Sequence, residues 1–422
     1  MRWHLLGVGA ALTASASVGA AQSVRTCLVV VDRTGGEGRQ VAVGGGVYHV
    51  FQSGGIWAHC RGEETQWYSD SIAWYQDIDR FDMVGHVDFQ DETAHMTSER
   101  ASYFLHDERL HATGNARLVN LVTKSVLRGP EMTYFRRVAG LRDTTRLVAG
   151  QRPTIEYHSE RDSAGAEPYL IVADRVQLVG NSAASSWGNV TIDRSDFHAK
   201  ADSATLDTEV GTGDLMSHAE VRGGDSTGYT LTGRNIQYRL EDRALRWVQA
   251  EQEAVALSAD WKVQADTVAF DIVDDRIQAG NAWGDSTQAV ATSVTNTITA
   301  DSLAIDAPGQ ILTTVRGIGA ARATTRLDSL DQARDWIAGD TVVAHFAPTL
   351  DGRTAISGIE AMGKASAYYR VFPEGGQDSI PDLSYSRGER IVAAFADDRL
   401  VRVDIVGKAD GVYLEGRRRK QP

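Results

Sequence analysis

The residues best able to do chemistry in this 422-residue chain are a glycine-flanked serine, three histidines and a repeated series of carboxylates. The serine lies in the stretch Gly224 to Gly228, which has the Gly-x-Ser-x-Gly pattern of a hydrolase nucleophile. That motif requires a strand that runs into a helix, whereas here it lies between two strand-like stretches. We interpret it as a turn and expect that the chain is not an enzyme.

The histidines and carboxylates are residue types that bind metal ions when they come together. His95, His106 and His111 match no familiar spacing of a metal site. The acidic residues recur about once in 30 residues and lack the glycine-rich nonapeptide of calcium-binding repeats. We interpret them as solvated turn carboxylates. The sequence also lacks a phosphate-binding glycine loop and a dinucleotide fingerprint, so we expect no metal and no cofactor.

The N-terminal residues 1–21 have the pattern of a cleaved signal peptide. Arg2 precedes an apolar stretch from Leu5 to Leu12, and small residues follow as far as Ala21. The apolar stretch is shorter than the roughly 18 residues that span a bilayer. The pattern predicts export to the periplasm, with association with the outer membrane as an option. An oxidising compartment permits a disulfide between Cys27 and Cys60, and two buried thiols are the alternative.

Charge argues against nucleic acid as a partner. Without the signal peptide, 42 basic side chains remain against 56 acidic ones, a net charge of −14. The only concentrated positive charge is the run Arg417 to Lys420, within the C-terminal residues 417–422. We interpret these six residues as a solvated basic tail.

One pattern recurs ten times along most of the chain. Each copy begins with a polar or charged residue, continues with apolar residues two apart, and reaches a polar turn before a second alternating stretch. The copies start 28 to 49 residues apart, and units of this size must stack on their neighbours to bury an apolar face. Their first residues are Asp70, Glu99, Glu131, Asp174, Asp202, Arg234, Asp266, Asp301, Asp340 and Glu389.

The period of two within each copy predicts strands. Ala101 and Tyr103 flank Ser102, and the stretch from Leu110 to Leu118 continues the alternation after a charged turn. We therefore expect an all-β fold, an elongated antiparallel β-roll of about ten hairpin repeats. It occupies residues 47–416 as one or two consecutive blocks, after an N-terminal segment of residues 22–46. Residues 328–336, as a short helix, and 373–381, as a loop, are expected insertions.

These units resemble the OstA-like periplasmic proteins of lipopolysaccharide export. The resemblance is clearest from Glu99 to Leu118, where Ala101-x-Tyr103 and the later Ala112-x-Gly114 follow the family's order. It extends from about Val47 to Glu415. The resemblance implies a twisted roll whose apolar inner groove holds acyl chains and passes lipid toward the outer membrane. It also implies edge-to-edge stacking with other β-roll components or with further copies of the chain.

The inward positions of the repeats are the candidate groove residues. Their alternation with polar residues places them on one face, where they would contact lipopolysaccharide or a similar glycolipid, or pack as ordinary core. A β-solenoid outside the cell that binds polysaccharide or acts as an adhesin or scaffold is the competing interpretation. The candidates are Tyr75, Tyr103, Tyr134, Leu178, Leu206, Tyr238, Phe270 and Ile305.

Overall fold

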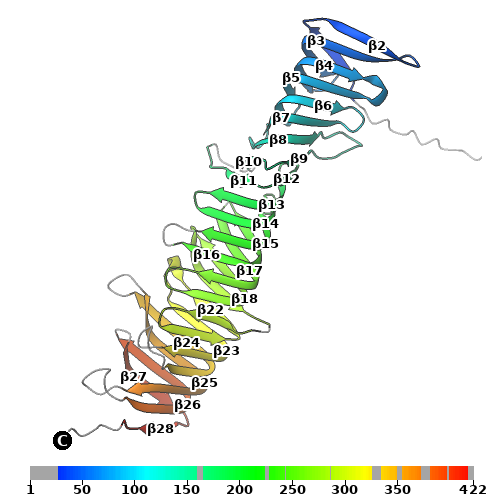
Figure 1. Ribbon diagram of the computed structural model, residues 1–422. Coiled ribbons are helices and arrows are strands. Elements are labelled where there is room, and N and C mark those ends of the chain that lie inside the picture. Colours follow the sequence, from blue (N-terminus) through cyan, green and yellow to red (C-terminus); the bar gives the residue numbers. More distant parts are fainter. Residues whose placement is uncertain are drawn as a thin grey trace, which may run out of the picture.

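The fold is all β. The computed structural model describes residues 27–158, 165–223, 228–242, 244–285, 287–325, 334–348, 354–371, 381–396 and 399–416, and these form a single 28-stranded sheet. All strand pairs in it are antiparallel, which confirms the antiparallel roll and contradicts a parallel solenoid for the described residues. The strands follow one another along an elongated body, from β1 at one end to β28 at the other (Figure 1).

Most of the strands are long and consecutive in sequence, and two single 3-10 turns, η1 (Gln76–Ile78) and η2 (Pro308–Gln310), interrupt them. The strands are β1 (Val29–Thr34), β2 (Gly38–Gly44), β3 (Val47–Cys60), β4 (Gln66–Tyr75), β5 (Arg80–Gln90), β6 (Ala94–Phe104), β7 (Arg109–Asn120), β8 (Val126–Phe135), β9 (Arg146–Gly150), β10 (Thr154–Tyr157), β11 (Tyr169–Val172), β12 (Arg175–Val179), β13 (Ala183–Arg194), β14 (Phe197–Asp207), β15 (Thr212–Gly223), β16 (Tyr229–Glu241), β17 (Ala244–Leu257), β18 (Lys262–Val273), β19 (Arg276–Trp283), β20 (Ala289–Thr292), β21 (Asn296–Ala300), β22 (Ser302–Asp306), β23 (Thr314–Thr325), β24 (Asp335–Pro348), β25 (Thr354–Val371), β26 (Asp382–Ala396), β27 (Arg399–Val406) and β28 (Asp410–Leu414).

The sheet begins before the expected boundary at Val47. β1 and β2 both pair with β3, so the N-terminal segment belongs to the same sheet as the repeats. A disulfide joins Cys27 to Cys60, and both residues are buried. A cross-link that closes a loop of this size stabilises the fold by about 3 kcal/mol. The first strands are therefore joined to the roll by a disulfide as well as by the backbone hydrogen bonds to β3.

We call each level of the sheet, made of one long strand or of two short strands in line, a rung. Each of the ten repeat starts lies at a bend in the middle of a rung. There the pairing register shifts, and the neighbouring strand usually carries a glycine with positive φ. Gly85 (φ 81°) faces Asp70, and Gly188 (φ 77°) faces Asp174. Several of the carboxylates accept a hydrogen bond from the residue after the glycine: Asp70 from His86, Glu99 from Asn115 and Asp174 from Asn189. The repeated acidic residues are thus bend residues rather than turn residues, which corrects the interpretation from sequence.

The bends divide every rung into two arms that face each other across an apolar interior. Aromatic rings from opposite arms meet there, as Phe89 meets Tyr103 with ring centroids 6.0 Å apart and Tyr229 meets Phe270 at 6.3 Å. The hairpin turns form two rows, one at the end of each arm. We call the row with residues 76–79, 105–108, 208–211 and 307–313 the A rim, and the row with residues 61–65, 91–93, 121–125 and 258–261 the B rim.

The rungs are interrupted near the middle of the chain. β9 and β10 share the partner β8, and β11 and β12 share the partner β13, so two short strands stand where most rungs have one long strand. The same division occurs at β19 and β20, which share β18, and at β21 and β22, which share β23. Figure 1 shows the short strands β9 to β12 between two stacks of longer ones. Hydrogen bonds between β12 and β9 and between β10 and β11 carry the sheet across, so the two blocks are parts of one sheet.

Several expectations fall outside the described residues. These include the signal peptide (1–21), the basic tail (417–422), residues 224–227 of the hydrolase-like motif, and most of both expected insertions. Where the expected helix of residues 328–336 is described, it is wrong: Asp335 and Trp336 begin strand β24, in which Trp336 pairs with Tyr368. None of the described segments forms a helix long and apolar enough to cross a membrane.

Candidate functional site

Seven of the eight candidate groove residues point into the interior. Tyr103, Tyr134, Leu206, Tyr238, Phe270 and Ile305 are buried, and Leu178 is partly buried against the same core cluster. That cluster is continuous from Cys27 to Ala393, because alternate residues of every rung contribute to it. The alternation in the sequence therefore identified the inner face correctly at these seven positions.

Tyr75 is the exception, and its selection from sequence is wrong. In β4 the inward residues are Ile72 and Trp74, and Trp74 stacks on the buried Phe81 with ring centroids 5.2 Å apart. Neighbouring residues of a strand face opposite ways, so Tyr75 lies on the outer face. There its ring contacts His49 and lies 4.8 Å from the guanidinium of Arg80.

Polar side chains join the two rims in the N-terminal part of the roll. Arg136, which follows β8 on the A rim, donates to the carboxylate of Glu108 on the same rim at 2.8 Å. It also donates to the carboxylate of Glu63 on the B rim at 2.7 Å, across the opening between the two rims, which we call the mouth. The Asp91 carboxylate lies 3.6 Å from Arg136 Nε. We call Glu63, Thr65, Asp91, Glu108 and Arg136 the polar lock. Only Glu63 in it is substantially exposed.

Two of the candidate tyrosines belong to this lock rather than to an apolar wall. The Tyr103 hydroxyl donates to Glu108 and accepts from Arg136, while the Tyr134 hydroxyl donates to Asp91 at 2.9 Å. Burial raises the pKa of both phenols well above the ordinary value. Burial lowers the pKa of the Arg136 guanidinium, but Tyr103, Glu63 and Glu108 outweigh it and the net shift is upward. The arginine is therefore held as a cation.

The N-terminus of the described chain also contacts the lock. The backbone N–H of Cys27 donates to the Glu108 carboxylate at 2.8 Å in a buried position. Glu108 is thus bound by Arg136, Tyr103 and the disulfide-linked Cys27. Removing one partner from such a buried ion pair costs about 3–5 kcal/mol, because the remaining charge is left without solvation. Parting the rims at this level would break the Cys27 bond to Glu108 and the bonds from Arg136 to Glu63 and Thr65.

Farther along, the mouth is wide and acidic. A hollow of about 1050 Å³ opens between the rims around Arg194, which donates to Asp196 and to the Tyr169 hydroxyl on its own side. The carboxylates lining this hollow outnumber its one described cation, and they are Glu167, Asp196, Glu209, Glu241, Asp242, Asp274 and Asp275. Its charge repels anionic head groups.

The mouth beyond this hollow is closed by apolar rings. Trp261 on the B rim meets Phe346 of the opposite arm edge to face, with ring centroids 5.2 Å apart. We call this pair the aromatic door. Behind it lies an apolar cavity of about 80 Å³, lined by both candidate residues Phe270 and Ile305 and by Tyr229, Ile277 and Leu312. Trp261 was not among the candidates from sequence, although it continues the alternation of the buried Val263 and Ala265.

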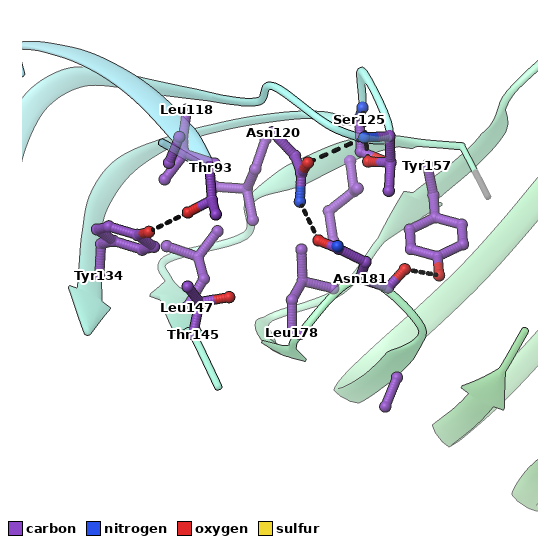
Figure 2. Close-up of a pocket in the computed structure, with 16 residues that line it drawn as sticks. Thr93, Leu118, Asn120, Ser125, Tyr134, Thr145, Leu147, Tyr157, Leu178 and Asn181 are labelled. Atoms are coloured by element: carbon purple, nitrogen blue, oxygen red, sulfur yellow. Dashed lines mark hydrogen bonds between the residues drawn. The ribbon is translucent and has the colours of Figure 1, made fainter. Parts of the chain in front are cut away.

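A second, smaller cavity lies at the junction of the two stacks. It measures about 30 Å³ and is lined by the candidate residues Tyr134 and Leu178, with polar groups around them. Figure 2 shows Asn120 and Asn181 pointing toward each other in it, and their side chains are hydrogen-bonded at 2.8 Å. The Tyr157 hydroxyl donates to the Asn181 carbonyl at 3.3 Å. A space of this size with amide and hydroxyl groups in its lining suits a single water molecule.

The apolar cavity behind the aromatic door is too small for a hydrocarbon chain. Benzene already occupies an apolar cavity of about 150 Å³, and the cavity behind the door measures about 80 Å³. Interiors are close-packed, so additional volume must come from movement of the two arms apart. Each buried methylene of a ligand contributes about 0.8 kcal/mol toward that movement.

The histidines considered as metal ligands are separated in the structure. His95 Nε2 contacts Asp88 at 3.0 Å, and His111 Nδ1 contacts the Thr133 hydroxyl at 2.9 Å. Within the described ranges, no three histidine, cysteine, aspartate or glutamate side chains come together as a metal site. The chemistry of the described interior is that of burial and hydrogen bonding.

The chain was compared with known proteins. No protein-family model matches it, and no curated protein matches it significantly. The interpretation of the interior therefore depends on its own geometry.

Proposed function

We propose that the chain is a periplasmic carrier of an amphipathic lipid, of the lipopolysaccharide type, and that it has no catalytic activity. The observation that carries the proposal is the continuous apolar interior between the two arms. The backbone joins the arms at the bends, along one side of the roll. A ligand with hydrocarbon tails and a polar head matches this arrangement: tails between the arms, head outside the rims. The disulfide at Cys27 and Cys60 supports an oxidising compartment.

The transfer step follows from the shape of the interior. The core cluster runs along the body without interruption, so a tail that has entered can move past successive inward residues. Edge strands at both ends have hydrogen-bonding groups available for a neighbouring β-roll component or another copy. Such stacking at the β28 end would extend the C-terminal part of the interior from one protein to the next. Head groups with phosphates must avoid the acidic hollow around Arg194.

The proposal is tested by photo-crosslinking the full chain to lipopolysaccharide with labelled acyl chains. A benzoylphenylalanine replaces Phe270 on the inner face, and in a matched control it replaces Gln237, which is exposed on the outer face. We expect labelled adducts at Phe270 at least tenfold above those at Gln237. Equal labelling at the two positions, or none at either, would overturn the proposal.

A further inference from the structure

The two closures of the mouth differ in chemistry, and this difference divides the interior. The polar lock crosses between the rims through the contacts of Arg136 with Glu63 and Asp91, whereas the aromatic door crosses through two rings. We infer that acyl chains enter the interior only at the aromatic door, and that the polar lock keeps the N-terminal part of the roll, before β9, closed to them. The inference rests on the proposed function and locates its binding site.

The lock resists hydrocarbon because none of its bonds can be replaced by a methylene. Arg136 on the A rim and Asp91 on the B rim each have a relative side-chain exposure of 8%, so both charges are solvated almost entirely by neighbouring polar groups. A tail between the rims there would leave ionised groups in an apolar environment without partners. The disulfide-linked Cys27 holds Glu108 from a further side, so the lock cannot shift as a unit without moving β1.

The aromatic door admits hydrocarbon because an acyl chain between the two rings replaces the apolar contact that they lose when they separate. Trp261 and Phe346 contribute apolar surface to each other, and methylenes between them would contribute the same kind of surface. The apolar cavity lies directly behind, so the first carbons of a tail find space before the arms part further. Small side chains at Ala256, Ala291 and Ala307 line this cavity and leave room beside Phe270.

The lock and the door also differ in their surroundings. The lock is bordered by a hollow of about 950 Å³ whose lining includes five carboxylates and three arginines, and both Arg136 and Arg137 reach a carboxylate on the opposite rim. The lining of the door cavity contains no charged side chain, and its polar side chains are Tyr229, Ser258, Trp261 and Gln310. A tail at the door therefore displaces no ion from its counter-ion.

The inference is tested with the full chain and the same labelled lipopolysaccharide. Benzoylphenylalanine is placed behind the lock at Phe89, which is fully buried between Tyr103 and Tyr134, and behind the door at Phe270. We expect at least tenfold more adduct at Phe270 than at Phe89. Comparable adducts at both positions would overturn the inference and leave the proposed function standing. Absence of adducts at both would overturn the two together.

A second pair of variants tests the point of entry. Trp261→Glu places a charge in the door and is expected to reduce the adduct at Phe270 at least tenfold, whereas Trp187→Glu, on the exposed outer face, is expected to leave it unchanged. An adduct at Phe270 that survives Trp261→Glu would show that tails enter elsewhere. Thermal melting of both variants establishes that each is folded before the comparison is made.

Discussion

At the scale of the residue, facing inward and touching a ligand are different properties. Tyr103 and Phe270 occupy equivalent inward positions of their repeats, but a buried phenol needs a hydrogen-bond partner and a buried benzyl group does not. Tyr103 finds its partners in Glu108 and Arg136 and becomes part of the polar lock. Phe270 needs no such partner, and its ring packs against the Tyr229 ring at the cavity behind the door. The candidate groove residues share one periodicity, but their side-chain chemistry separates those that belong to the polar lock from those that line the cavity behind the door.

One prediction at this scale concerns Asp275 on the A rim. Burial raises the pKa of this carboxyl above its ordinary value of 3.8, the nearby Asp196 adds to the rise, and Arg194 opposes it. A carboxyl with a raised folded-state pKa stabilises the fold below its unfolded-state pKa and loses that contribution as pH rises through the folded value. Asp275→Asn should therefore raise the melting temperature at about pH 7 and not at about pH 3.

The expected gain is less than about 1 kcal/mol, because the carboxyl is largely in contact with solvent. Melting curves of the two proteins across this pH range measure it. If Asp275→Asn lowers the melting temperature near neutral pH, attraction to Arg194 exceeds the cost of burial and the prediction fails.

At the scale of the element, the bends explain both the repeat and its loose period. A strand changes direction most easily where a glycine takes a left-handed conformation and a polar side chain opposite it binds the freed backbone or its neighbour. Asp174 with Gly188 and Glu99 with Gly114 are two such pairs. Turn lengths on either rim can vary without disturbing these pairs. The units therefore keep their acidic starts while their spacing varies.

A glycine substitution tests the role of the bends. At Gly188, φ is 77° and an added Cβ would lie 2.8 Å from the Asp174 Cβ, whereas at Gly46 φ is 81° and no atom lies within 4 Å. Gly46→Ala should lower the free energy of unfolding by about 1–2 kcal/mol, because alanine is strained in a left-handed backbone conformation. Gly188→Ala should cost measurably more, as judged by denaturant unfolding. Equal losses would mean that the bend tolerates the added methyl group.

At the scale of the whole molecule, the roll ends in edge strands at both ends. In the described chain β2 pairs only with β3, and β28 pairs only with β26. All five residues of β28 are exposed, and Val412, Tyr413 and Leu414 are each more than half exposed. A strand edge with apolar side chains recruits a partner strand unless charge or a covering segment prevents it. We expect the chain to associate end to end as its concentration rises.

Charged residues in β28 should weaken this association. The double variant Val412→Lys, Leu414→Lys places two charges at the edge, and sedimentation velocity should show at least a several-fold higher concentration for half-association than in the unmodified chain. Val122→Lys, in an exposed turn of the B rim, is the matched control and should leave association unchanged. Association that is insensitive to both variants would place the contact elsewhere.

The sequence by itself determined the class of fold and the inner face of most strands. A period of two is a local property, since neighbouring strand residues point opposite ways whatever surrounds them, and the repeats of hairpin length imply antiparallel stacking. Its one error on the inner face, Tyr75 in place of Trp74, came from a copy with two adjacent aromatic residues, between which a hydrophobic pattern does not discriminate.

Only the tertiary structure decided how the interior is closed. Arg136 meets Glu63 across 73 residues of sequence and Glu108 across 28, and Trp261 meets Phe346 from a different rung and the opposite arm. Such contacts depend on the twist of the roll and on where each rim turns, and neither is a property of a local pattern. The disulfide was a permitted pairing that became definite once β1 paired with β3 and brought Cys27 beside Cys60.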